Sequence, residues 1–272
     1  MSIRQFYRSK LTPITKADKP YDRKAKKRLG RKSIFLMSYE TNEIMNDTDT
    51  LFCQFKELYS SCKLNDQTEG FVRDGIINPS IYSLQRTKIL FIAKEHNQLS
   101  QPTDCSNERI DRDYRMWWNV DFKYRFAHRV SEWACGILDG FLTDYEQINY
   151  EQKSSAIRSI AFINVKKTCG GSRATHSVIL DYIKYSRELL HQQIEAISPT
   201  LIVGCFRYDH FVEELFNSQL ALNRVVVSDG FNFSYGRWKH INIINFYHPS
   251  SRLKKKRLYE LMREALERVI KS

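Results

Sequence analysis

The sequence predicts an α/β domain built on a mainly parallel β-sheet. Short apolar runs recur along the chain, at residues 88–92, 160–163, 201–203 and 241–244. Runs of this kind are typical of strands that are buried on both faces. Helical stretches lie between them, and an alternation of strands and helices favours a parallel sheet covered by helices.

The chain begins with a strongly basic segment, residues 1–32, which we expect to form an arm ahead of a single domain at residues 33–272. Pro13 and Pro20 interrupt the arm, which has few periodic apolar positions. It carries a net charge of +10 out of the chain's +12. A basic arm on a nearly neutral body indicates a polyanionic partner held by non-specific electrostatics, and a solvated tail is the alternative.

Periodic apolar positions predict the helices that follow. The expected helical stretches are residues 41–62, 124–139, 178–197, 207–219 and 252–270. Pro199 ends the third of these just before its strand. A weaker apolar run at Val225–Val227 indicates one further strand.

Several classes of protein do not fit the composition. The six cysteines form no C-x-x-C pair, so we expect neither a metal site nor a compact disulfide framework, and no cofactor. No apolar run approaches the roughly 18 residues of a membrane helix, and we expect no secretory signal. The sequence therefore favours a monomeric protein with reduced thiols in the cytoplasm, or in the nucleus of a eukaryote if Lys24–Arg28 acts as a signal.

Polar clusters follow three of the predicted strands. They are Ala93–Gln98, Asn164–Ser172 and Asn245–Arg252. Ligands of open parallel sheets bind beyond the carboxyl ends of the strands, where these clusters are expected to meet. The sequence thus predicts one functional site at this edge of the sheet.

The three clusters, in this order, resemble the signature regions of the uracil-DNA glycosylase superfamily. The match covers roughly residues 85–272 and is clearest at His248-Pro249-Ser250. Ala93 stands where the family usually has Gly, and His96 where it has Pro, so the chain resembles a divergent member. The resemblance implies a three-layer sandwich with a central, mainly parallel four-stranded sheet, and an enzyme that flips a pyrimidine nucleotide and hydrolyses its N-glycosidic bond.

The resemblance implies two catalytic residues, Glu95 and His248. Cleavage of the bond leaves positive charge on the sugar and negative charge on the base, so a site needs an anion and a donor. Glu95 would steady the sugar and orient or deprotonate the water, unless it caps the loop or pairs with Lys94. His248 would donate to the base oxygen, unless it is a structural histidine of the loop.

The expected substrate-binding residues are Asn164, Asn97, His96 and Phe122. An Asn side chain offers a donor and an acceptor to a pyrimidine edge, although Asn is also a common turn residue. Asn97 stands where uracil-specific relatives place an aromatic residue, so it suggests a pocket that tolerates a substituent on C5. Phe122 is the expected stacking partner of the flipped base, with Trp117-Trp118 as the alternative.

The expected DNA-backbone contacts come from two further segments. They comprise Gly170, Gly171, Ser172, Ser250, Arg252, Lys254, Lys255 and Lys256. Backbone amides of the Gly-Gly segment would approach a phosphate, unless it is simply a turn. Arg252 or Leu253 would enter the duplex as a wedge, and the lysines would release counterions from phosphates unless they form a solvated helix face.

Three functions stay open at this point. The first is excision of a modified, 5-substituted pyrimidine in defence against viruses, and the second is excision of uracil in DNA repair. The third is non-catalytic DNA binding by the same fold. A metal-dependent nuclease is disfavoured because no Asp, Glu or His cluster has ligand spacing.

Overall fold

The computed structural model describes residues 49–62, 64, 71–97, 112–170, 174–217 and 220–271. The basic arm, residues 1–32, and the predicted DNA contacts Gly171 and Ser172 lie outside the described residues.

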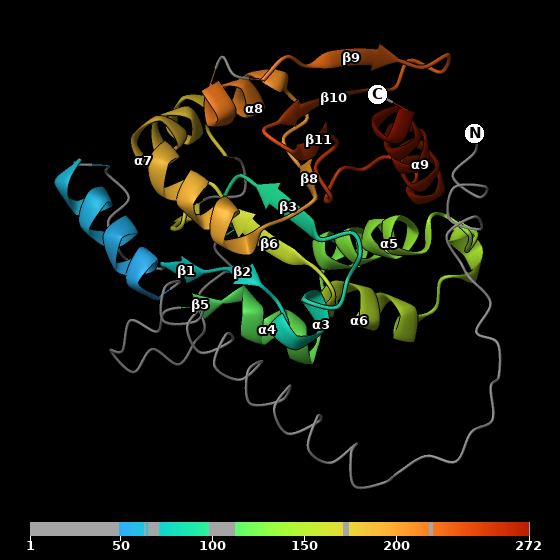
Figure 1. Cartoon of the computed structure of the whole chain (residues 1–272), viewed down its shortest axis with the longest axis horizontal. Coiled ribbons are helices and arrows are strands. Elements are labelled where there is room, and N and C mark those ends of the chain that lie inside the picture. Colours follow the sequence, from blue (N-terminus) through green and yellow to red (C-terminus); the bar gives the residue numbers. More distant parts are fainter. Residues whose placement is uncertain are drawn as a thin grey trace, which may run out of the picture.

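A mixed sheet of seven strands forms the centre of the molecule (Figure 1). Its strands, in spatial order, are β2 (Gly75–Ile76), β6 (Ala161–Asn164), β3 (Ile89–Ala93), β8 (Leu201–Gly204), β11 (Ile241–Asn245), β10 (Asn232–Trp238) and β9 (Asn223–Val226). The four strands β6, β3, β8 and β11 run parallel to one another, whereas β2, β10 and β9 pair in antiparallel fashion. Two short parallel pairs join β1 (Val72–Arg73) to β5 (Arg112–Asp113) and β4 (His96–Asn97) to β7 (Cys169–Gly170).

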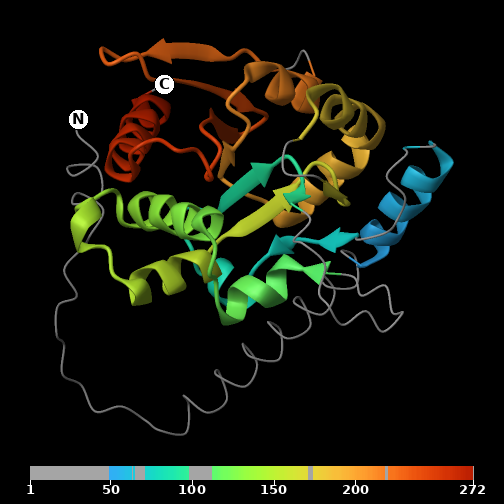
Figure 2. The ribbon, with the colours of Figure 1, turned by 180° about the vertical axis from the view of Figure 1, so that it is seen from behind.

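Helices cover both faces of this sheet (Figures 1 and 2). They are a helix at residues 49–61, α3 (Pro79–Tyr82), α4 (Tyr114–Val120), α5 (Arg125–Asp139), α6 (Tyr150–Arg158), α7 (His176–Ile197), α8 (Asp209–Phe216) and α9 (Lys255–Lys271), with a 3₁₀ turn η1 (Tyr145–Gln147). The long helix α7 ends at Ile197. Its C-cap Ser198 has a left-handed φ of 51° and directly precedes Pro199, which cannot continue a helix.

The core has two layers because successive side chains of a strand point to opposite faces. Phe91 and Phe162 belong to the buried cluster on the side of α4, α5, α6 and α9. Ile92 and Ile163 belong to the cluster on the side of α7, α8 and the helix at residues 49–61. The central strands are buried at every position, as their continuous apolar runs predict.

The prediction of an α/β fold is confirmed, but the expected four-stranded, mainly parallel sheet is wrong, since the sheet is mixed and has seven strands. The four predicted strands form its contiguous parallel part. β2 is too short to be recognised, and β10 reads Asn-Phe-Ser-Tyr-Gly-Arg-Trp, which is no apolar run. The weak run at Val225–Val227 overlaps the edge strand β9.

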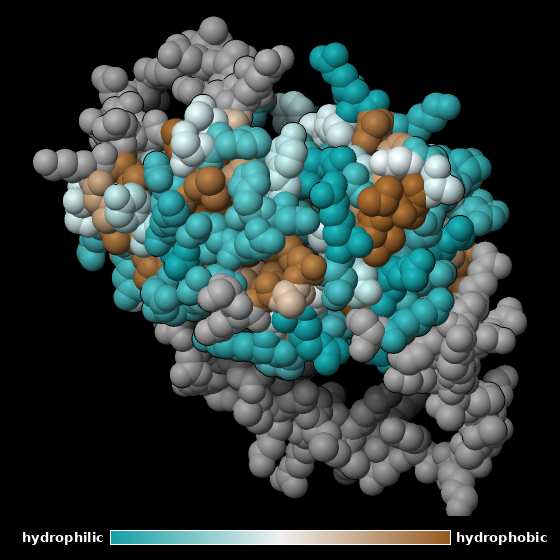
Figure 3. Space-filling view, turned by 90° about the horizontal axis from the view of Figure 1, so that it is seen from above, coloured by the Kyte–Doolittle hydropathy of each residue, from teal (hydrophilic) through white to brown (hydrophobic). Residues whose placement is uncertain are grey.

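The surface seen from above Figure 1 carries apolar side chains in small separate patches among hydrophilic ones (Figure 3). In the part of the chain that the structure describes, no helix combines the length and apolar character that crossing a membrane requires.

Candidate active site at the carboxyl edge of the sheet

The parallel register brings the first two polar clusters together. Ala93 at the end of β3 pairs with Asn164 at the end of β6. The pairing continues beyond both strands, because Lys166 N donates to Lys94 O at 2.9 Å. It resumes in β4 and β7, where Asn97 pairs with Gly170. The third cluster follows β11, which is parallel to the same group of strands.

Glu95 lies at this edge with its carboxylate nearly buried. Its side chain is 8% exposed, and Oε2 accepts a hydrogen bond from Lys166 Nζ at 2.8 Å. The Lys166 side chain is itself 3% exposed, and its ammonium also donates to Cys169 O at 3.3 Å. Glu95 is therefore paired with Lys166, rather than with the neighbouring Lys94 that the sequence suggested as an alternative.

Gly170 makes room for Glu95. A Cβ atom built on Gly170 would overlap the carboxylate of Glu95. Any other residue here would have to displace the Glu95 side chain or the loop that carries it. The structure therefore gives Gly170 a steric role beside Glu95, and its predicted phosphate contact stays a prediction.

A second buried lysine, Lys167, holds the segment that follows β6. Lys167 is fully buried, and its ammonium donates to both carboxylate oxygens of Asp74, at 2.8 and 3.0 Å, and to Gln193 Oε1 at 2.7 Å. Asp74 also accepts from the backbone N of Asn164 at 2.8 Å. Successive lysines thus reach two different carboxylates, which fixes the path of the chain after β6.

Asn164 presents a buried amide at the end of β6. It is 1% exposed, and neither polar atom of its side chain has a hydrogen-bond partner among the described residues. The amide lies close enough to the Tyr114 hydroxyl to offset part of the rise in pKa that burial causes there. A buried amide without partners is costly in a folded protein, so it is suited to receive a ligand.

His96 is held inside an aromatic group. Its Nδ1 lies 2.6 Å from the hydroxyl of Tyr114, and its ring lies 5.5 Å from that of Trp117. Trp117 is 37% exposed, so it is accessible beside the first cluster. Asn97 is exposed in β4.

His248 is oriented by its own loop. The backbone N of Ser250 donates to His248 Nδ1 at 3.2 Å, which places the ring proton on Nε2 when the imidazole is neutral. Burial, together with the nearby ammonium of Lys94, lowers the pKa of His248 to about 4. None of the residues that the structure describes accepts a hydrogen bond from Nε2. His248 therefore has the properties of a neutral donor whose proton is unused.

Phe126 lies beside His248, whereas another aromatic ring covers Phe122. Phe126, half-buried at the start of α5, lies 5.4 Å from the His248 ring. Phe122 is 4% exposed, and its ring stacks on Tyr150 at 5.4 Å and 13°. Tyr150 thus covers one face of the Phe122 ring. A flipped base would stack more readily on Phe126 or Trp117.

The predicted backbone-contacting residues after His248 are exposed. They are Ser250, Arg252, Lys254, Lys255 and Lys256. Helix α9 begins at Lys255, so the basic run opens the last helix as the sequence indicates. Lys256 forms an exposed ion pair with Glu146 at 2.6 Å, which leaves less of its charge for a phosphate.

Sequence reasoning missed three residues of this site: Lys166, Tyr114 and Phe126. Lys166 lies within the predicted polar cluster Asn164–Ser172, and its position two residues after the strand-ending Asn164 was a usable signal. Tyr114 and Phe126 gave no such signal, because their elements reach the site only through helix packing.

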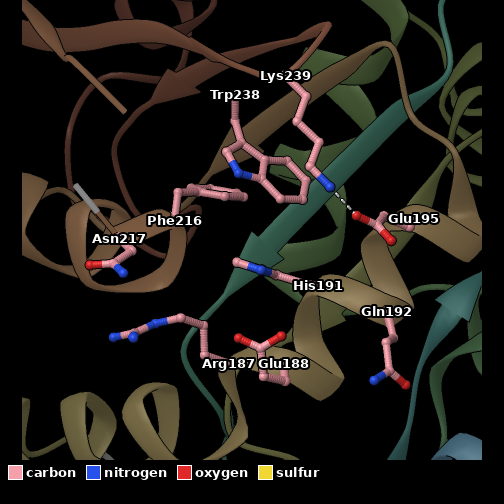
Figure 4. A pocket seen from close by; sticks show the side chains of 9 residues that line it. All are labelled: Arg187, Glu188, His191, Gln192, Glu195, Phe216, Asn217, Trp238 and Lys239. Carbon is pink, nitrogen blue, oxygen red and sulfur yellow. Dashed lines mark hydrogen bonds and ion pairs between the residues drawn. The ribbon is translucent and has the colours of Figure 1, made fainter. Parts of the chain in front are cut away.

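The structure also has a surface pocket of about 310 Å³ at the opposite edge of the sheet (Figure 4). Trp238, Phe216 and His191 form its aromatic side, and a Lys239–Glu195 ion pair borders it. Trp238 ends β10 opposite Ile241, where β11 begins. This pocket therefore lies away from the clusters that follow the parallel strands.

Within the described residues, no group of three or more His, Cys, Asp or Glu side chains is arranged to hold a metal ion. No protein-family model matches the chain, and no curated protein matches it either.

Proposed function

We propose that the protein is a DNA glycosylase that flips a pyrimidine nucleotide and hydrolyses its N-glycosidic bond. One observation carries this proposal: His248 is held as a neutral imidazole whose Nε2–H is free to donate, at the sheet edge where Glu95 lies. Together with the sequence resemblance, this pairing of a neutral donor and a carboxylate fits the two charges that develop in the reaction.

In the proposed reaction, the bond between C1′ of the sugar and the base nitrogen breaks, and its electron pair leaves with the base. His248 Nε2–H donates a hydrogen bond to the base oxygen on which negative charge collects. Glu95 stabilises the positive sugar and orients a water molecule, whose oxygen bonds to C1′. One proton of the water passes to the departing base, directly or by way of Glu95, so the products are the free base and an abasic site.

The buried amide of Asn164 supports recognition of the base. Both of its polar atoms lack partners in the described chain, and a pyrimidine edge supplies one acceptor and one donor for them. Phe126, which contacts His248, is the proposed stacking residue, with Trp117 beside His96 as a second aromatic wall.

We propose a 5-substituted pyrimidine as the substrate, and hence a role in defence against viruses with modified genomes. Asn97 is small, polar and exposed, so it leaves space where an aromatic side chain would press on C5. Uracil is the alternative substrate and would make the protein a repair enzyme. DNA is bound in either case by Ser250, Arg252 and the lysines at the start of α9.

A second candidate function, DNA binding without catalysis, is favoured by the ion pair of Glu95. A carboxylate that accepts from Lys166 at 2.8 Å and is 8% exposed is less available to a sugar or a water molecule. This candidate predicts binding with a steep salt dependence and no abasic sites.

The deciding experiment incubates the full chain with duplexes that carry uracil, a thymine mismatch or a 5-modified cytosine, and assays abasic sites. Excess chelator is present throughout, since the proposed reaction uses no metal. We expect abasic sites with at least one 5-substituted base. The variants Glu95→Gln and His248→Gln should lose 100-fold or more in rate while they still bind DNA.

The matched control is Glu188→Gln, which alters a carboxylate at the opposite edge of the sheet and should keep the full rate. Abasic sites from plain uracil alone would select the repair enzyme. Tight DNA binding without abasic sites on any substrate would select the non-catalytic protein.

A further inference from the structure

Three exposed rings lie together where α7 and α8 begin. His176 starts α7, and its ring is 5.1 Å from that of Tyr208 and 5.7 Å from that of His210. Tyr208 and His210 stack at 5.7 Å with 20° between their planes. Tyr208 is 50% exposed, and both histidines are exposed. The two helices lie side by side in both views of the fold (Figures 1 and 2).

A cation lies beneath these rings. Lys94 Nζ is 4.9 Å from the ring centre of Phe211 and 6.0 Å from that of Tyr208. Among the described residues, no carboxylate forms an ion pair with it. The nearest acid of α8, Asp209, already accepts hydrogen bonds from Ser234 Oγ at 2.8 Å and Asn245 Nδ2 at 2.7 Å.

Lys94 also connects the rings to the candidate site. Burial is the main cause that lowers the pKa of His248 and of His176, and the charge of Lys94 is the second cause for both. The ammonium therefore lies within electrostatic range of both histidines. Lys94 directly follows β3 and precedes Glu95, and its ammonium lies over the rings of Phe211 and Tyr208, so this residue joins the candidate site to the three rings.

We propose that His176, Tyr208 and His210 form a stacking platform for unpaired bases of the DNA strand next to the flipped nucleotide, with Lys94 attracting the intervening phosphate. This inference rests on the proposed function and names where the strand continues. Exposed rings stack on any base through the faces that they do not turn toward one another, and a cation without an ion pair suits the backbone between two bases. Thr175 makes no side-chain cap, and the first turn of α7 has no acidic residue, so the first N–H groups of this helix add positive character.

Exposed rings pack against a protein partner as well as against bases, but the composition of this surface favours DNA. Its exposed members are two histidines and a tyrosine, and Lys94 supplies a positive charge. The part-buried Asp209 between Tyr208 and His210 is engaged by hydrogen bonds from Ser234 and Asn245. A protein-binding surface would be expected to have a more apolar centre.

The test measures DNA binding by fluorescence anisotropy, at fixed salt, with fluorescent oligonucleotides that carry no target base. One is a duplex with a single-stranded tail and the other is a blunt duplex of the same sequence. Tyr208→Ala and His210→Ala should each weaken binding to the tailed DNA by about ten-fold, because each removes one stacking ring. Tyr208→Trp should keep the affinity, and binding to the blunt duplex should hardly change.

Tyr185→Ala is the matched control, since Tyr185 is 54% exposed on α7 and takes no part in the three-ring group. Its affinity should stay within two-fold of the unmodified protein. Equal affinities of the unmodified protein and Tyr208→Ala for the tailed DNA would overturn the platform, as would equal losses on tailed and blunt DNA.

The outcome is independent of catalysis because no target base is present. Selective loss of tailed-DNA binding with no excision on any substrate would uphold the platform and reject the glycosylase. Excision by the unmodified protein with unchanged binding by the ring variants would reject the platform alone.

Discussion

The carboxylate of Glu95 fills the space that a side chain at Gly170 would occupy. Two segments that are far apart in sequence thus meet with no room for an added methyl group. The pairing of Asn97 with Gly170 in β4 and β7 holds the backbones in this register. The geometry of Glu95 therefore depends on the absence of a side chain at Gly170 as much as on the hydrogen bond that Lys166 donates to Glu95.

Gly170→Ala should displace Glu95 and lower the excision rate by about 100-fold, since a shift of roughly 1 Å in a catalytic group has effects of that size. Single-turnover kinetics on the preferred substrate measure it. In a Glu95→Ala background, the same change should add less than two-fold, because the methyl group then has space. Equal effects in both backgrounds would show that Gly170 acts without Glu95.

Acid should destabilise the protein through His248. Its pKa of about 4 in the folded chain lies below the ordinary value of 6.5, so the unfolded chain binds more protons between these values. The contribution is fully present above pH 6.5 and is lost as the pH falls to 4, by about 3 kcal/mol. Urea unfolding at pH 7 and pH 4 should show that the unmodified protein loses this much more stability than His248→Gln. The exposed variant His240→Gln should behave like the unmodified protein.

Lys94→Met should raise the pKa of His248, because the Lys94 charge is the second cause of its low value. Burial is the larger cause, so the pKa should stay below 6.5. An NMR titration of the histidine ring signals measures the change. Lys255→Met is the control, since Lys255 acts on the pKa of His128 instead. An unchanged His248 titration in Lys94→Met would place the two groups too far apart to interact.

Asp74→Ala should cost about 3–5 kcal/mol of unfolding free energy, because it leaves the buried Lys167 ammonium without its carboxylate. Denaturant unfolding measures the loss. Glu195→Ala removes the acid of an ion pair that is half-exposed on both sides, so its cost should stay below about 1 kcal/mol. Similar losses in the two variants would mean that the buried pair does not hold the loop after β6.

The central strands were predictable because continuous apolar runs in a chain of this composition are typical of strands that are buried on both faces. The helices α5, α7 and α9 were predicted within about three residues, since their apolar periodicity is long. The edge strand β10 was not, because its polar and aromatic residues alternate without an apolar run. The small strands β4 and β7 exist only through their mutual pairing, which no local pattern encodes.

The candidate site divides in the same way. The sequence by itself determined that polar clusters at Glu95, Asn164 and His248 follow strands, because each cluster adjoins its own apolar run. Only the tertiary structure decided that Lys166 pairs with Glu95, that Gly170 is open for its carboxylate, and that Tyr150 covers Phe122. These are contacts between segments distant in the chain. Their energies depend on burial and distance, which exist only once the sheet has set its register and the helices have packed on its faces.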